Sequence, residues 1–422
     1  MAEVAEGAAQ RPDVAQRGGA AMDSVRGGIT APLGFTSAAV HGGIKKQPGA
    51  LDVSILVAEQ PATAAGIFTT NLACAAPVIV SRQHLAHGAG AARAVVVNSG
   101  CANACTGDAG FEDAREMART AAAALGCAPE QVLVASTGVI GVALPMPTLV
   151  PAIGQAVERR TRGAGADMAR AIMTTDPFPK EHAVAVESPA GRFIVGGTAK
   201  GSGMIEPNMS TMLGFLATDA AVPAPLLRRA LRESARGTFN AITVDGECST
   251  NDSLFALASG ASGVAIDESS YPALLGAFTA VSRELALGIV RGGEGATKLV
   301  AITVRGAASE EDARRIARTI ANSPLVKTAV HGADPNWGRI VAAAGRSGVM
   351  LEIDRTTVHV GGVLLFENGR PHDDAAPLAE AHLRGREIAI DVNIGSGADF
   401  AATIWTCDLS AEYVRINGEY RT

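Results

Sequence analysis

Predicted strands and helices follow one another irregularly along this chain, and that order most limits the folds open to it. A doubly wound parallel sheet needs strands and helices that alternate regularly. Here the apolar segments 182–187 and 192–196 follow each other directly, as do 242–246 and 252–259. Such pairs predict hairpins. We therefore expect an α/β fold of layered sheets rather than one doubly wound sheet.

The clearest helix is predicted over 271–291, where apolar residues recur at helical spacing: Leu274, Phe278, Val281, Leu285 and Ile289. A second helix is predicted over 310–321. Further strands are predicted at 51–57, 66–69, 93–98, 131–136, 299–305, 357–365 and 386–394.

The chain is long enough for more than one structural unit. With 422 residues, of which 47% are hydrophobic, it can bury the core of two or three units. We expect a main α/β domain over 29–300 and a smaller C-terminal α/β domain over 301–422. Residues 1–28 are rich in Ala, Gly and Gln without an apolar signal core, so we expect a flexible tail and a cytoplasmic protein.

Charge and hydropathy argue against two classes of partner. The formal net charge of −6 does not favour nucleic acid. The local basic run of Arg228, Arg229 and Arg232 is typical of a solvated helix face. We also expect no membrane, since we find no apolar run of the roughly 18 to 20 residues that a membrane helix needs.

Several common kinds of site are absent from the sequence. There is no phosphate-binding P-loop, dinucleotide fingerprint, paired-cysteine or zinc motif, and no G-x-S-x-G elbow. The eight histidines are scattered, so no serine–histidine–acid triad is visible. We expect neither a metal nor a cofactor. What remains is a high density of Thr, Ser, Asn and Gly at predicted turns.

One hydroxyl residue, Thr211, lies where a small, polar segment becomes an apolar strand within residues 200–219. A hydroxyl nucleophile without histidine can use its own α-amino group as base, if the preceding peptide bond is broken. An α-amine with a pKa of about 7.8 is roughly one third neutral near pH 7.5, whereas an unshifted lysine is almost wholly charged. The position alone is equally compatible with an ordinary threonine at the entry of a strand.

The segment 200–213 (KGSGMIEPNMSTML) closely resembles the self-cleavage segment of the ornithine acetyltransferase (ArgJ) family. The resemblance runs from about residue 28 to residue 422. It includes 27–35 (GGITAPLGF), 98–107 (NSGCANACTG), 135–141 (ASTGVIG), 172–176 (IMTTD), 244–252 (VDGECSTND), 293–298 (GEGATK), 322–328 (NSPLVKT), 334–339 (DPNWGR) and 413–422 (YVRINGEYRT).

This resemblance implies a self-cleaving enzyme with a fold of the ArgJ, amino-terminal-nucleophile-like type. The cut between Ser210 and Thr211 gives an α chain of 1–210 and a β chain of 211–422, which stay together as an α2β2 heterotetramer. The implied activity is that of a glutamate N-acetyltransferase of arginine biosynthesis. Thr211 takes the acetyl group from N2-acetylornithine, ornithine leaves, and glutamate accepts the acetyl group in a second, ping-pong step.

The resemblance also assigns the remaining site residues. Thr137 and Gly138 match the family's oxyanion hole. Substrate-binding positions match Thr174, Lys200, Thr211, Glu294, Asn417 and Thr422. We expect Lys200 to meet a substrate carboxylate and Glu294 the amino group of ornithine. Acetyl-CoA is expected as a co-substrate if the enzyme is bifunctional.

Two positions next to the cut depart from the common family pattern. Residue 210 is Ser where Ala is more frequent, and residue 206 is Glu where many members carry Ala. These departures leave open a paralogue with altered acyl or amine specificity. The sequence is also compatible with an amidase or aminopeptidase that uses the same type of nucleophile, and with an uncleaved amino-acid-binding or assembly protein.

Overall fold

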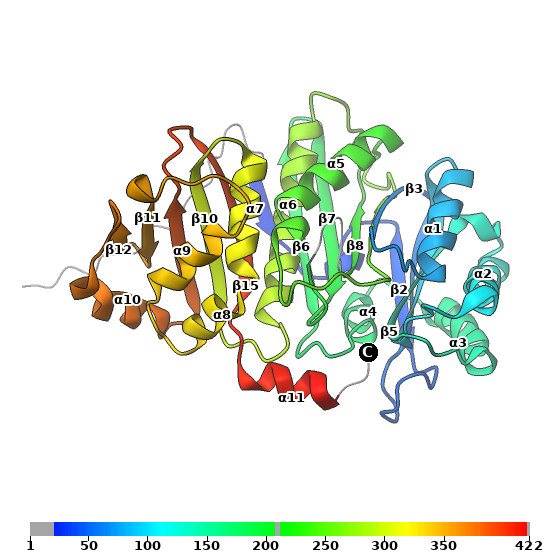
Figure 1. The fold of residues 1–422 in the computed structure, drawn as a ribbon. Helices are drawn as coiled ribbons and strands as arrows, with labels where there is room; N and C mark the ends of the chain where they lie inside the picture. Colours follow the sequence, from blue (N-terminus) through cyan, green and yellow to red (C-terminus); the bar gives the residue numbers. More distant parts are fainter. Residues whose placement is uncertain (1–20, 207–211, 420–422) are drawn as a thin grey trace, which may run out of the picture.

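The structure, a computed structural model, describes residues 21–206 and 212–419. Two β-sheets organise these residues, and helices cover their faces (Figure 1). The strands of the larger sheet lie between residues 21 and 258, and those of the smaller sheet between 299 and 407. The predicted layered α/β fold with a smaller C-terminal α/β part is confirmed. The boundary near residue 300 stays a prediction.

The larger sheet has the strand order β1-β6-β7-β8-β9-β3-β4-β5, and β2 pairs separately with β3. The pairs β4–β5 and β8–β9 are parallel, and the other pairs are antiparallel. Its strands are β1 (Ala21–Ser24), β2 (Phe35–Val40), β3 (Val53–Phe68), β4 (Ala91–Cys101), β5 (Val132–Val139), β6 (Lys180–Ser188), β7 (Gly191–Lys200), β8 (Leu213–Thr218) and β9 (Ser253–Ala258).

Strand β3 joins two parts of this sheet: β4 and β5 on one side of it, and β9, β8, β7, β6 and β1 on the other. We predicted separate strands at 51–57 and 66–69, but the structure has one strand of 16 residues. Its pairing with β4 shifts register between Val57 and Ala62, and only its second half pairs with β9. One buried apolar cluster contains side chains from both parts, such as Leu133 of β5 and Phe255 of β9.

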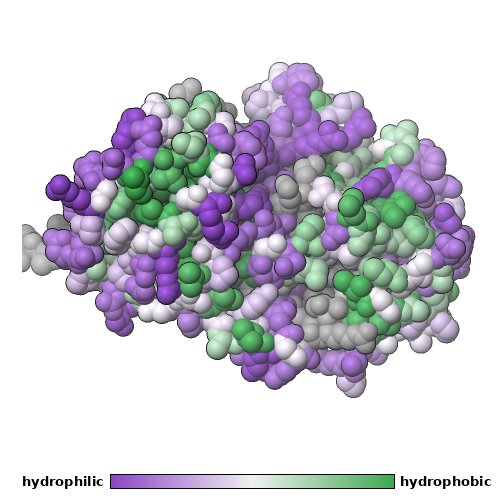
Figure 2. Space-filling view, in the orientation of Figure 1, coloured by the Kyte–Doolittle hydropathy of each residue, from purple (hydrophilic) through white to green (hydrophobic). Residues whose placement is uncertain are grey.

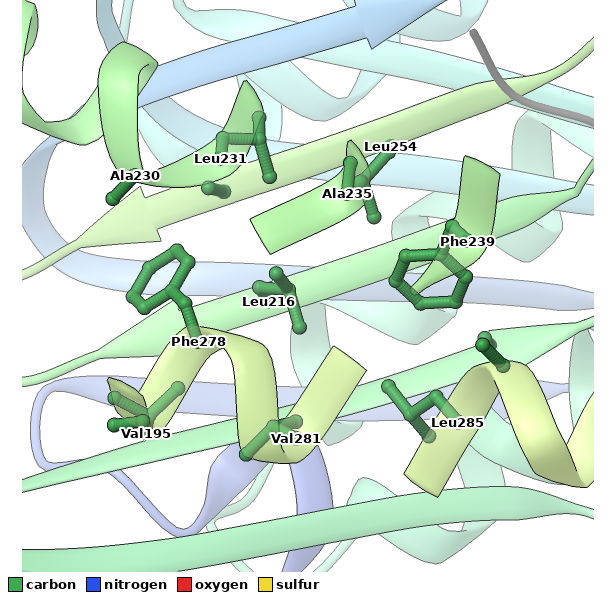
Figure 3. Close-up of a cluster of buried hydrophobic side chains, with 14 of the residues drawn as sticks. Val195, Leu216, Ala230, Leu231, Ala235, Phe239, Leu254, Phe278, Val281 and Leu285 are labelled. Atoms are coloured by element: carbon green, nitrogen blue, oxygen red, sulfur yellow. The ribbon is translucent and has the colours of Figure 1, made fainter. Parts of the chain in front are cut away.

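Two groups of helices cover the larger sheet. Helices α1 (Ala76–His87), α2 (Gly107–Leu125) and α3 (Met146–Arg159) share a core with β3, β4 and β5. Helices α5 (Ala224–Arg236) and α6 (Tyr271–Arg291) share another with β7, β8 and β9. In Figure 3, Phe278, Val281 and Leu285 of α6 lie beside Leu216 and other sheet residues. Helix α4 (Gly165–Ala171) packs near β2.

The length predicted for α6 agrees with the structure, and all five residues of its apolar repeat are buried. At 21 residues, α6 is long and apolar enough to cross a membrane by length and composition. It nevertheless packs between α5 and the strands β6 and β7. This packing accounts for its apolar character, as in the core helix of a layered fold.

The smaller sheet has the order β13-β12-β11-β14-β10-β15, and only β10–β14 is parallel among its described pairs. Its core includes apolar residues of the helices α7 to α10. The elements are β10 (Leu299–Ala307), α7 (Glu310–Ala321), α8 (Pro324–His331), α9 (Trp337–Gly345), β11 (Thr357–Val360), β12 (Val363–Glu367), β13 (Arg370–Pro371), α10 (Ala376–Leu383), β14 (Glu387–Asn393), β15 (Phe400–Cys407) and α11 (Ala411–Glu419).

Three predictions need correction. Residues 21–24, which we assigned to the tail 1–28, form β1 because they pair with 184–187 of β6; residues 1–20 lie outside the described residues. Residues 242–246 are not a strand, because their main chain bonds to two different segments: the Thr243 amide donates to Trp405 and the Val244 amide to Ile205. The strand predicted over 357–365 is the hairpin β11–β12, which turns at the positive-φ residues Gly361 and Gly362.

The basic run on α5 lies on the surface, as predicted. Arg228 and Arg232 are exposed, while Arg229 is half-buried and forms two hydrogen bonds to Glu268. Figure 2 shows hydrophilic residues gathered over α5 in the upper middle of the view. The apolar face of the same helix contributes Leu227 and Leu231 to the core.

Candidate active site

One cavity collects six of the predicted site residues from five separate segments of the chain. Its lining includes Thr137, Gly138, Thr174, Lys200, Glu294 and Asn417. Met212 and Leu213, at the start of β8, also line it. Ser210, Thr211 and Thr422 lie outside the described residues. The described part of the predicted site is therefore brought together by the fold.

The predicted oxyanion turn lies at the end of β5. Gly138 has φ +130°, a conformation that favours glycine. A Cβ atom on Gly138 would lie 2.3 Å from the carbonyl carbon of Gly100 in the neighbouring strand β4. Asn251 holds this turn from the other side, since its Nδ2 donates to the carbonyl oxygens of Ser136 (2.9 Å) and Ala102 (2.6 Å).

Lys200, the last residue of β7, forms hydrogen bonds to two other residues that were predicted to belong to the site. Its Nζ donates to the hydroxyl oxygen of Thr137 at 3.2 Å and to that of Thr174 at 2.9 Å. The residue is only 9% exposed, so its charge is held close to the cavity rather than in bulk solvent. A cation in this position can attract a substrate carboxylate or stabilise developing negative charge.

Buried Asp176 fixes the segment that carries Thr174. Its Oδ2 accepts from the Thr174 amide at 3.1 Å, and its Oδ1 accepts from Lys180 at 2.6 Å and from the Gly201 amide at 2.7 Å. Burial alone would raise the pKa of Asp176, but the charges of Lys200 and Lys180 outweigh it and hold the pKa below its usual value. Asp176 is therefore an anion that anchors both β7 and the Thr174 turn.

Helix α11 contacts two acidic residues of the cavity wall, Glu294 and Asp245. Asn417 donates from Nδ2 to Glu294 Oε2 at 2.8 Å. The hydroxyl of Tyr413, one helical turn earlier, donates to Asp245 at 3.2 Å. Burial and the nearby Asp245 raise the pKa of Tyr413. Asp245 also accepts from the amides of Met204 (2.7 Å) and Ile205 (2.8 Å), so it secures the chain just before the predicted cut.

Glu206, one of the two departures, points to α7 and not into the cavity lining. Its carboxylate accepts a hydrogen bond from Asn322 and one from the Thr243 hydroxyl at 3.3 Å. Arg318 of α7 lies 3.6 Å away. Glu206 therefore attaches the segment before the predicted cut to the helical layer of the smaller sheet.

The sequence alone gave no role to several residues of the cavity wall. These are chiefly Asp245, Glu247, Asn251, Asp252 and Tyr413. They belong to the segments 244–252 and 413–422, which carry part of the family resemblance. The density of polar residues in these segments is the feature of the sequence that could have pointed to them. Among the described residues, no three His, Cys, Asp or Glu side chains cluster closely enough to hold a metal ion.

The cavity has one lysine, several carboxylates and a glycine turn, which together suit a small substrate carrying both charges. Comparison with known proteins gives the class of the chain. The ArgJ family matches residues 36–422. The arginine biosynthesis bifunctional protein ArgJ of Symbiobacterium thermophilum is 48% identical over 407 residues, which are 95% of this chain and all of that one. Its namesake from Dehalococcoides mccartyi is 50% identical over 94% of this chain and 98% of that one.

Two solved structures are similar in sequence to parts of the chain. The bifunctional protein ArgJ of Bacillus halodurans is 37% identical, with a TM-score of 0.48, over 50% of this chain and all of that one. An ornithine acetyltransferase of Mycobacterium tuberculosis, solved with ornithine, is 43% identical, with a TM-score of 0.41, over 44% of this chain and 99% of that one.

These sequence matches define the chain first as an enzyme of the acetyltransferase class. The chain belongs to the ArgJ family, with which nearly its whole length aligns. The predicted family and the predicted enzyme class are thereby confirmed.

Proposed function

We propose that this enzyme cuts itself between Ser210 and Thr211 and then transfers an acetyl group from N2-acetylornithine to glutamate. The observation that carries the proposal is the convergence of six predicted residues on the cavity that Met212 also lines. Met212 directly follows Thr211, so the start of β8 belongs to the cavity wall. The names of the relatives, which are proteins of arginine biosynthesis, support the same reaction.

The proposed reaction has two acyl transfers. Thr211 Oγ attacks the acetyl carbonyl while the α-amino group of Thr211 takes the hydroxyl proton. Thr137 and Gly138 stabilise the oxyanion, and a donor of this kind is worth about 2.7–4 kcal/mol. The bond to the ornithine nitrogen breaks, and that nitrogen takes the proton. The amino group of glutamate then attacks acetyl-Thr211 and regenerates the hydroxyl.

Charged groups of both signs in the cavity wall would orient the substrate. Lys200 would attract a carboxylate, and Glu294, held by Asn417, would bind an ammonium group. An amino-acid substrate needs partners of both signs, because a buried charge without a partner costs several kcal/mol. We assign the same cavity to acetylornithine and glutamate in turn, as ping-pong transfer requires.

Intact mass spectrometry before and after incubation with N2-acetylornithine tests the proposal. We expect two chains, 1–210 and 211–422, and one acetyl group on the second. The variant Thr211→Ala should stay a single chain and transfer nothing. A single intact wild-type chain without acetyl transfer would instead support a binding or assembly protein.

Added glutamate separates the transferase from an amidase or aminopeptidase. Loss of acetylornithine should depend on glutamate, and a rate that is independent of glutamate would favour the hydrolase. Glutamate analogues and other acyl donors test for a paralogue of altered specificity. Acetyl-CoA should replace acetylornithine as donor only if the enzyme is bifunctional.

We further propose an α2β2 assembly of the cut chains in the cytoplasm, without a metal or another cofactor. Light scattering of the cut enzyme tests the assembly, and fractionation of the source cells tests the location. Dialysis against a chelator should leave acetyl transfer unchanged.

A further inference from the structure

Another cavity, which shares no lining residue with the candidate active site, is rich in arginine. Its volume is about 420 Å³, within the usual range of small-molecule sites. We call it the arginine groove, after five residues of its lining: Arg236, Arg314, Arg315, Arg318 and Arg346. The lining also has two glutamates, so its formal charge is +3, whereas the whole chain carries −6.

Three elements of the fold bring these arginines together. Arg314, Arg315 and Arg318 belong to α7, whereas Arg236 ends α5 and Arg346 directly follows α9. Like charges four residues apart on a helix, such as those of Arg314 and Arg318, destabilise the helix. The groove is therefore not the solvated face of a single helix but a site at which separate elements concentrate positive charge.

Nearby carboxylates compensate only part of this charge. Glu310 lies 2.9 Å from Arg236 and 3.0 Å from Arg314. In the part of the chain that the structure describes, no carboxylate lies within ion-pair distance of Arg315 or Arg346. Both of these residues are exposed, so a ligand from solution can reach them.

One guanidinium in the groove wall is incompletely hydrogen-bonded. Arg318 Nη2 donates to the carbonyl oxygen of Asn240 at 2.7 Å. Its Nη1 is buried, and no described residue accepts a hydrogen bond from it. Glu206 lies 3.6 Å away, beyond hydrogen-bond distance. Since buried donors without an acceptor are rare, the groove wall keeps a positive group that its own surroundings do not fully satisfy.

Arg315 and Arg346 lie on neighbouring parts of the groove. Arg346 Nη2 donates to the carbonyl oxygen of Thr319, one turn of α7 beyond Arg315, at 3.3 Å. A Cβ atom added to Gly348 would lie 2.8 Å from Arg315 Nη2. A ligand that meets both arginines therefore contacts α7 and the segment after α9 together.

This arrangement favours a phosphate group over a carboxylate. A guanidinium can donate two parallel hydrogen bonds to either anion. A carboxylate has its two oxygens in one plane, whereas a phosphate group presents oxygens in several directions. Arginines on different elements around one groove need acceptors in several directions.

We propose that the arginine groove binds the phosphate groups of a small organic phosphate, with Arg315 and Arg346 as the main contacts. Two sources share this chemistry: a free diphosphate compound, and the nucleotide end of a coenzyme such as acetyl-CoA. The groove is separate from the acetyl-transfer cavity, so this inference stands apart from the proposed function.

Isothermal titration calorimetry of the purified full-length protein with pyrophosphate, ADP and CoA tests the proposal. The titrations are made at an ionic strength of about 0.15 M, where attraction between distant exposed charges is largely screened. We expect saturable binding. Comparable binding of pyrophosphate and CoA assigns the groove to the diphosphate itself, and tighter binding of CoA assigns it to a nucleotide coenzyme.

The double variant Arg315→Ala plus Arg346→Ala should raise the Kd of each phosphate compound by about tenfold or more, because charge-assisted hydrogen bonds are lost. Arg228→Ala plus Arg232→Ala is the matched control. It removes the same two charges from the exposed face of α5, outside the groove lining, and should bind as wild type does. Equal weakening in the two double variants would overturn the site, since it would show attraction by net charge alone.

Titration of the wild-type protein with citrate keeps the test independent of how the variants fold. Citrate carries only carboxylates and should bind about tenfold or more weakly than pyrophosphate. Equal binding would overturn the assignment to phosphate. If wild type binds no phosphate compound and the groove variant loses its assembly in light scattering, the groove is instead an interface between copies of the chain.

Discussion

Gly138 illustrates how one residue type can determine the shape of a site. Gly138 has a φ of +130°, and an added Cβ would lie 2.3 Å from the carbonyl carbon of Gly100. A side chain at this position would therefore require the backbone to move. The same turn holds Thr137 beside Lys200. A change at Gly138 should therefore affect catalysis through geometry, since an oxyanion donor acts only from a narrow range of positions.

We predict that Gly138→Ala lowers kcat for acetyl transfer by about 100-fold or more, because the donor turn moves away from the oxyanion. Steady-state kinetics with acetylornithine and glutamate measure this. Gly154→Ala, in α3 with open space around the added Cβ, is the control and should keep full activity. Equal activity of both variants would rule out the oxyanion turn.

A second single residue, Lys45, makes the stability of the folded chain depend on pH. Its Nζ donates to the carbonyl oxygens of Leu51 (2.8 Å) and Ala171 (3.1 Å). Burial lowers the pKa of Lys45 to about 8 from 10.5, against the opposing charges of Asp52 and Asp176. Between these values the unfolded chain binds more protons than the folded chain, so stability rises with pH.

We predict that this rise is smaller in Lys45→Met than in wild type. Urea unfolding at about pH 8 and about pH 10 gives the two free energies for each protein, and the difference between proteins isolates Lys45 from other groups. Identical pH dependence in both proteins would show that the pKa of Lys45 is not lowered on folding.

At the scale of elements, Glu206 attaches the loop before β8 to helix α7. Its carboxylate contacts Asn322, Thr243 and Arg318, which belong to parts of the chain far from it in sequence. Burial lowers the pKa of Arg318, against the charge of Glu206. Removing Glu206 would leave this largely buried guanidinium without its acidic partner.

We predict that Glu206→Ala lowers the free energy of unfolding by about 1.5–3 kcal/mol, the range for hydrogen bonds to charged groups. Adding Arg318→Met to Glu206→Ala should recover part of the loss, because the unpaired charge disappears. Urea denaturation of wild type, both single variants and the double variant measures the coupling. Strictly additive effects would mean that the two side chains do not interact.

At the scale of the whole molecule, the C-terminal segment completes a cavity built mainly by the larger sheet. Asp408 accepts from the amides of Thr297 (2.7 Å) and Lys298 (2.9 Å), and the Ser410 hydroxyl donates to Gly295 at 2.6 Å. These contacts align α11 with the Glu294 turn. Helix α11 itself has no buried residue, so it contributes to the site more than to the core.

We predict that deletion of 411–422 abolishes acetyl transfer while Tm stays near the wild-type value. The deletion removes the contacts to Glu294 and Asp245 but little apolar surface. Activity assays and thermal unfolding measure the two effects. Arg415→Ala, which removes exposed ion pairs on α11, should be active. Full activity of the deletion variant would contradict a role of α11 in the site.

Local sequence patterns predicted much of the fold. The apolar repeat of 271–291 and the pattern of 310–321 agree with α6 and α7 because helical period depends only on nearby residues. Residues 242–246 were mispredicted, since their backbone and Asp245 bind the distant segment 204–205. The single strand β3 was missed because its continuity depends on pairing with β9.

The sequence by itself determined the family, because the family's motifs are recognised from the order of residues along the chain. The expected nucleophile Thr211 and the residue types of the site follow from the same motifs. Only the tertiary structure decided that Thr137, Lys200 and Glu294 share a cavity. It also decided that Asp252, in the wall of the same cavity, is buried. The physical reason is that burial, and the pKa that follows from it, depends on strands and helices that are distant in sequence.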